Sequence, residues 1–141
     1  MYLYLSSKGD PGFDGVNQWY DFYCTLSEPL LLDPKRDWRV SIMELYIQDK
    51  VTKNYDGDLL VYIKSDLAKA SYVDRQKEPI LAACTMKDCL QTVKSFKRIF
   101  NVPCAVDNIN TVHLYISPSQ GSLPSLDDSA VTRVTLLVSE A

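Results

Sequence analysis

The fold is decided by the stretch from Trp38 to Ile47, which reads WRVSIMELYI and is rich in strand-forming residues. Every second residue from Trp38 to Ile42 is apolar, and the apolar phase then slips by one and continues from Met43 to Ile47. A period of two with one slip predicts a central β-strand with a β-bulge near Ile42 and Met43. The alternatives are a strand buried on both faces or a short helix, which the bulky and β-branched residues disfavour.

Other segments of the chain repeat this strand pattern. Residues 19–26 and 111–117 alternate strictly between apolar and other side chains, with Pro29 expected to break the first of these strands. Apolar runs bounded by turn residues predict further strands at residues 2–6, 59–64 and 131–138. Residues 80–84 are a further strand candidate, whose two alanines leave the assignment open. Short strands at intervals of about 8 to 12 residues are typical of an antiparallel β-sandwich or barrel. We therefore predict an all-β fold.

One segment has a helical period instead. Apolar residues recur at intervals of three and four between Met86 and Phe100, which predicts one inserted amphipathic helix of about 14 residues near 86–100. Thr85 is a suitable N-cap residue, and Pro103 prevents continuation. Lys87, Lys94 and Arg98 would then form a solvated basic flank, so that nucleic acid is not an expected partner.

Length and composition indicate one ordinary globular domain covering residues 1–141. The chain is 46% hydrophobic and 23% charged with a net charge of −3, which predicts no bulk attraction to nucleic acid or to a membrane surface. Its start lacks a signal-peptide pattern and no stretch is apolar enough to span a membrane, so we expect a protein that is not secreted and has no membrane partner. The four cysteines match no common zinc spacing and predict partly buried thiols in a reducing compartment.

The sequence offers little for catalysis or metal binding. His113 is the only histidine, lies mid-strand and is accompanied by no Gly-x-Ser-x-Gly motif, so a surface-facing strand residue is favoured over a catalytic triad. Acidic residues 56 and 58 around Gly57, and the pair Asp127 and Asp128, are favoured as turn residues over a calcium site. Glycine-rich phosphate loops are absent. We expect no catalytic residue, metal, cofactor or small-molecule substrate.

Aromatic residues are more informative, because nine tyrosines and two tryptophans exceed what one small core easily holds. Four of them lie opposite the apolar phase of their predicted strands, and two leucines lie in a polar loop. An outer binding face and a second face packed on the predicted helix are equally compatible with this pattern. The candidate interface residues are Trp19, Tyr23, Tyr46, Tyr115, Leu123 and Leu126.

A series of short motifs runs in order along nearly the whole chain. It comprises Phe22-x-x-x-Leu26, Pro29-Leu30-x-Leu32, Trp38-x-Val40-x-Ile42-x-Glu44, Val61-Tyr62-Ile63-x-x-Asp66, Pro79-Ile80-Leu81, Val112-x-Leu114-x-Ile116 and Val134-Thr135-Leu136. In this series the chain resembles the jelly-roll proteins of Polinton-type elements and adenovirus-like DNA viruses, including penton-like minor capsid proteins.

The resemblance implies a single jelly-roll antiparallel β-sandwich without an active site. It further implies a homo-oligomer that meets other virion proteins at or near a capsid vertex, located in the virion after synthesis in the host cytoplasm or nucleus. An alternative function stays open, namely a monomeric ligand- or carbohydrate-binding β-sandwich in which Trp19 and the tyrosines stack on sugar rings.

Overall fold

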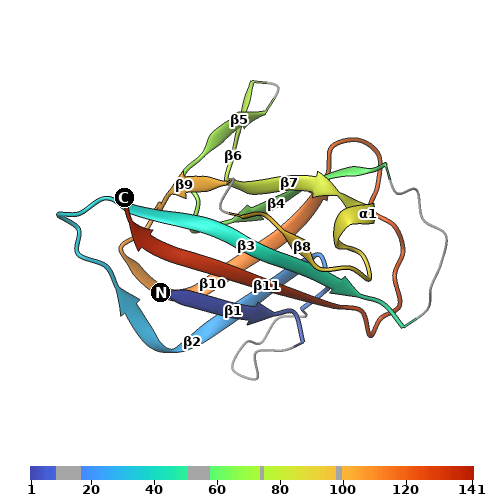
Figure 1. Cartoon of the computed structure of the whole chain (residues 1–141), viewed down its shortest axis with the longest axis horizontal. Helices are drawn as coiled ribbons and strands as arrows, with labels where there is room; N and C mark the ends of the chain where they lie inside the picture. The colour runs from blue at the N-terminus through green and yellow to red at the C-terminus, as the bar shows by residue number, and fades with distance from the viewer. Residues whose placement is uncertain (9–16, 51–57, 74, 98–99) are drawn as a thin grey trace.

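The computed structural model describes residues 1–8, 17–50, 58–73, 75–97 and 100–141 (Figure 1). Within these residues the chain forms eleven β-strands and one short helix, which confirms the predicted all-β class. The elements are β1 (Tyr2–Ser6), β2 (Asp21–Leu31), β3 (Trp38–Gln48), β4 (Leu60–Ser65), β5 (Ser71–Val73), β6 (Gln76–Glu78), β7 (Ile80–Thr85), α1 (Met86–Cys89), β8 (Lys94–Ser95), β9 (Asn101–Pro103), β10 (Asn108–Pro118) and β11 (Val131–Glu140).

Two antiparallel sheets carry the fold. Sheet A has the order β1-β11-β3-β8, and β9 pairs with the same edge of β3 as β8 does. Sheet B has the order β2-β10-β4-β7. The small β5–β6 hairpin projects from the body of the sandwich (Figure 1).

The strand order identifies a jelly roll. Strands β1 to β4 alternate between the two sheets, β4 pairs with β7, and the chain then returns through β8 and β9 to sheet A, β10 in sheet B and β11 in sheet A. If β8 and β9 are taken as two pieces of one edge strand, four strands face four strands with two Greek-key connections, which is the jelly-roll arrangement. The predicted single jelly-roll sandwich is confirmed.

Strand β3 has the predicted slip. Its core-facing residues on both sides of the slip are fully buried: Val40, Ile42, Leu45 and Ile47. Along the pairing with β11, Ile42 faces Leu136 whereas Glu44 faces Thr135, which leaves Met43 as an additional residue on β3. This β-bulge lets the apolar residues before and after it point into the same core.

The core between the sheets follows the alternation of the long strands. In β10, Val112, Leu114 and Ile116 are buried while the intervening His113 and Tyr115 are only half-buried, as predicted. Apolar residues of β11 and β3 supply the opposite side of the same cluster. Each long strand therefore has one face in the core and one outer face.

Pro29 does not break β2, contrary to the sequence-based expectation. β2 continues to Leu31 because it is the edge strand of sheet B, where a proline needs no partner for its missing N–H. The ladder with β10 is nevertheless irregular here, since Thr25 faces Thr111 and Leu30 already faces Ile109. The edge is therefore distorted near Pro29.

The predicted helix over residues 86–100 is wrong in its length. α1 covers only Met86–Cys89, and Gln91 has a φ of 59°, a left-handed conformation that ends the helix. From there the chain follows β3, with the Gln91 N–H donating to Ile47 O at 2.8 Å. Unsatisfied backbone groups along β3 thus outweigh the weak helical preference of the segment.

The spacing of three and four has a different cause from a helix. Met86 and Cys89 lie on the single turn of α1 and are buried, and Phe96, which follows β8, is also buried. Val93 is exposed by 56%. One helical turn followed by an extended edge segment therefore buries some of the apolar residues at these intervals and leaves others exposed. The predicted basic flank is lost with the helix, and Arg98 lies outside the described residues.

Candidate interaction surfaces

Trp19 is buried, with 6% of its surface exposed, so its predicted place on an outer face is wrong. A tight turn precedes β2, in which Gln18 and Asp21 exchange two backbone hydrogen bonds of 2.9 and 3.2 Å. Trp19 lies in this turn and does not follow the alternation of the strand. Its carbonyl accepts a hydrogen bond from the Thr132 hydroxyl at 2.6 Å, which ties the turn to β11.

The other predicted interface residues are half-buried. Tyr23 and Tyr115 lie on the outer face of sheet B, and Tyr46 lies on the outer face of sheet A. Leu123 and Leu126, between β10 and β11, pack partly against the core. Their exposure is therefore less than the sequence suggested, and a role in an interface stays a prediction.

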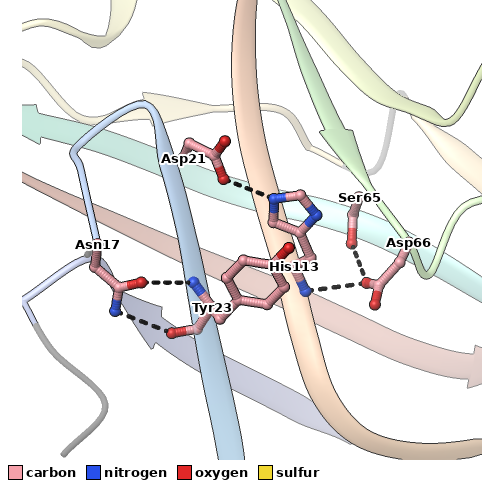
Figure 2. A network of polar contacts seen from close by, with 6 residues as sticks. All are labelled: Asn17, Asp21, Tyr23, Ser65, Asp66 and His113. Atoms are coloured by element: carbon pink, nitrogen blue, oxygen red, sulfur yellow. Dashed lines mark hydrogen bonds and ion pairs between the residues drawn. The ribbon is translucent and has the colours of Figure 1, made fainter. Parts of the chain in front are cut away.

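His113 is the centre of a stacked cluster on the outer face of sheet B. Its imidazole is parallel to the Tyr23 ring, with centroids 4.1 Å apart and an interplanar angle of 4° (Figure 2). It also stacks with Tyr115 at 4.7 Å and 24°. On its edge, Nε2 lies 2.6 Å from Asp21 Oδ1. The ring is thus held by three side chains.

The order of strands in sheet B brings these residues together. β10 runs between β2 and β4, which places His113 directly opposite Tyr23. On the other side, the His113 backbone N–H donates to Asp66 Oδ1 at 3.0 Å, and the Ser65 hydroxyl donates to the same oxygen at 3.2 Å (Figure 2).

Asn17 anchors the end of the cluster at β2. Its Oδ1 accepts the Tyr23 N–H at 3.0 Å, and its Nδ2 donates to the Tyr23 carbonyl at 3.3 Å (Figure 2). A side-chain amide thus imitates a neighbouring strand at this edge. Tyr23 is held in place by backbone bonds as well as by its ring contact.

An ion pair adjoins the cluster. Lys64 Nζ lies 3.1 Å from Glu78 Oε2 and also over the Tyr115 ring, 5.8 Å from its centroid. Burial raises the pKa of the Tyr115 phenol, and the carboxylates of Glu78, Asp21 and Asp66 raise it further. The outer face of sheet B is therefore a network in which charged and aromatic groups contact one another.

This network lacks the arrangement of a nucleophilic triad. The described contacts of the His113 side chain are a carboxylate and two aromatic rings. The nearby Ser65 hydroxyl donates to the Asp66 carboxylate, whereas the imidazole meets Asp21. The geometry fits a structural cluster that orders three strands.

The outer face of sheet A is more open. Tyr2 and Tyr4 on β1 are exposed by 53% and 77%, and their rings stack at 6.3 Å. Beside them lies a groove of about 410 Å³ whose lining is largely apolar, formed by Tyr4, Glu44, Tyr46, Val93, Arg133 and Thr135 among others. Large apolar groups in contact with solvent are typical of interaction surfaces.

Tyr2 and Tyr4 were absent from the predicted interface. The segment is predicted as a strand, in which tyrosine alternates with leucine. Leu3 and Leu5 are buried, which leaves the two tyrosines on the outer face. This alternation was the available signal.

Metal and thiol chemistry find little support in the part of the chain that the structure describes. No three His, Cys, Asp or Glu residues gather there as a metal site would require, and residues 51–57 of the predicted acidic turn lie outside it. Asp127 Oδ1 accepts the Ser129 N–H at 2.9 Å, which is a local turn contact. Cys84 and Cys89 share a hydrogen bond, which together with burial raises the pKa of Cys89.

Comparison with known proteins gives the chain no relative: no protein-family model, curated protein or solved structure matches it. Among the described residues, no helix is long and apolar enough to cross a membrane. Function has therefore to be inferred from the fold and from its two outer faces.

Proposed function

We propose that this chain is a structural subunit of a virus or virus-like particle, acting through contacts with copies of itself and with other particle proteins. The observation that carries the proposal is the strand order, β1-β11-β3-β8 facing β2-β10-β4-β7. The sequence resemblance to penton-like proteins implies this jelly-roll order independently of the structure. Jelly rolls are a common architecture of coat proteins, although the fold alone also serves other functions.

The open face of sheet A gives further support. Exposed Tyr2 and Tyr4 and the adjoining groove present apolar surface of the kind that interfaces bury. The described polar cluster around His113 is better explained by structure than by catalysis. The proposal accordingly assigns no reaction to the protein.

Light scattering of the purified chain tests the proposal, alone and mixed with the major coat protein encoded on the same genome. We expect a species larger than the monomer in the mixture. The double variant Tyr2→Ala/Tyr4→Ala should reduce its amount, whereas Tyr72→Ala, which removes a similarly exposed tyrosine from β5, should not. A strictly monomeric chain that binds no particle component would contradict the proposal.

A ligand- or carbohydrate-binding function is the second candidate. It is favoured by the rings of Tyr23 and Tyr115 beside the carboxylates of Asp21 and Asp66, because sugar sites combine aromatic and hydrogen-bonding groups. Burial of Trp19 removes its most prominent stacking residue. Glycan-array binding that is lost on Tyr23→Ala would support this candidate, and an absence of binding to any glycan would remove it.

A further inference from the structure

β1 is an edge strand whose backbone alternates between two sides. Met1 and Val138 exchange two backbone hydrogen bonds of 2.8 Å, and the Ser7 N–H donates to Thr132 O at 2.9 Å. In an antiparallel pair the bonded residues alternate, so the odd-numbered residues of β1 face β11. The N–H and C=O groups of Tyr2, Tyr4 and Ser6 therefore point away from sheet A.

These outward groups are only partly satisfied. The Ser6 carbonyl accepts the Cys24 thiol at 3.3 Å. Within the described segments, no backbone hydrogen bond joins the outward groups of Tyr2 or Tyr4 to another strand. Two N–H and two C=O groups thus form a template for a further strand.

The other edges of the sandwich are protected against such pairing. β2 contains Pro29 and an irregular ladder, and β7 has a bulge where Ala82 faces Ile63 but Ile80 faces Lys64. β8 and β9 are only two and three residues long. β1 has none of these devices, because its sequence YLYLS lacks charge and proline and pairs one-to-one with β11.

We infer that β1 pairs antiparallel with β1 of a second copy of this chain, which continues sheet A across a two-fold axis. The strand is self-complementary, because Tyr2 of each copy lies opposite Tyr4 of the other. Each of these two residue pairs can exchange two N–H···O=C hydrogen bonds. Leu3 then lies at the axis, and each Tyr2 ring lies across from a Tyr4 ring on the outer face. The inference rests on the proposed assembly role and specifies one of its contacts.

The neutral character of the strand favours a second copy as the occupant. Identical strands with a charge at the paired positions would repel one another. The tyrosines of β1 are neutral, and Tyr2 and Tyr4 already stack on each other within one chain. A single strand pair is smaller than a standard interface, so we expect a dissociation constant on the order of tens of micromolar.

Sedimentation velocity on the full chain, from about 1 µM to about 1 mM, tests the pairing. Tyr4→Pro removes an outward N–H and leaves the bonds to β11 in place, and Tyr4→Lys puts like charges on the two paired strands. Each should raise the dissociation constant by about 10-fold or more. The matched control Tyr72→Lys, at a tyrosine exposed by 69% on β5, should change it by less than about 2-fold.

Circular dichroism establishes that each variant is folded, and if Tyr4→Pro is not, Tyr4→Lys decides alone. A wild-type monomer at the highest concentration, a dimer insensitive to the folded Tyr4 variants, or equal weakening by Tyr72→Lys would each overturn the inference. Binding of a different coat protein that is lost on Tyr4→Lys, in a chain that stays monomeric alone, would assign the edge to that partner instead. A dimer that joins no particle would contradict the proposed function and leave this contact standing.

Discussion

The two outer faces of the sandwich carry tyrosines in the same alternating pattern, yet the structure uses them differently. On sheet B, Tyr23 and Tyr115 stack on His113, whose edge meets Asp21. On sheet A, Tyr2 and Tyr4 are exposed by more than half and stack on each other. Aromatic content alone therefore does not mark a binding face. The distinction is whether the groups are satisfied within the chain.

The position of each strand in its sheet explains the difference. His113 is on β10, which has neighbours on both sides, so that side chains from β2 and the end of β4 reach it. Tyr4 is on β1, which pairs only with β11 in the described part of sheet A. A central strand gathers partners, whereas an edge strand leaves its side chains and backbone available.

The inner faces of the two sheets should contribute alike to stability, because both are packed into one core. Leu114→Ala in sheet B and Leu136→Ala in sheet A each remove a side chain that is almost fully buried. We expect each to lower the free energy of unfolding by about 2 to 5 kcal/mol, through lost burial and a cavity. Urea unfolding measures both values. A loss below about 1 kcal/mol for either would show that the sheets already differ in their cores.

The outer face of sheet B should contribute to stability. His113→Ala removes the Asp21 contact and both ring contacts, and we expect a loss of about 1 to 2 kcal/mol. Tyr72→Ala on β5 is the exposed aromatic control, with a change below about 0.5 kcal/mol. If His113→Ala unfolds at the same urea concentration as wild type, the cluster is not stabilising.

The same face should respond to alkaline pH. Because burial and nearby carboxylates raise the pKa of Tyr115 in the folded state, its contribution to stability is present below the unfolded tyrosine pKa of about 10 and is lost as pH rises through the folded pKa. Between about pH 8 and pH 11 the melting temperature should therefore fall less steeply with pH in Tyr115→Phe than in wild type. Parallel pH profiles of the two proteins would contradict this expectation.

The smallest effect is expected on the outer face of sheet A. Tyr4→Thr keeps a strand-forming residue and removes an exposed ring, so in dilute protein the free energy of unfolding should change by less than about 0.5 kcal/mol. The urea midpoint at low micromolar concentration measures this. A loss above about 1 kcal/mol would mean that the ring is already satisfied within one chain, and the comparison would fail.

Much of the fold was predictable, because local alternation reports burial directly. The slip after Ile42 predicted the bulge at Met43, and the phase of β10 predicted its inner and outer residues. The jelly-roll arrangement was an implication of the resemblance and not of periodicity, and the pairing of distant strands was not predicted. Periodicity also failed for residues 86–100, where one helical turn and an edge strand reproduce a helical spacing.

The candidate surfaces were less predictable. Trp19 was misplaced because a turn interrupts the alternation just before β2. The contacts of His113 join residues 92 and 47 positions apart, so no local pattern contains them. The exposure of Tyr2 and Tyr4 depends on β1 being an edge, which follows only from the order of the sheet.

The pairing of β1 with β11 also bears on how the protein is made. The first strand of sheet A contacts the last one described, with Tyr2 opposite Leu137. Sheet A is therefore incomplete until residues near 140 have left the ribosome, and closing so long a loop is slow. During translation the apolar side of β1, with Leu3 and Leu5, has no sheet to cover it. A chain at that stage exposes apolar surface of the kind that makes incompletely folded proteins prone to aggregation.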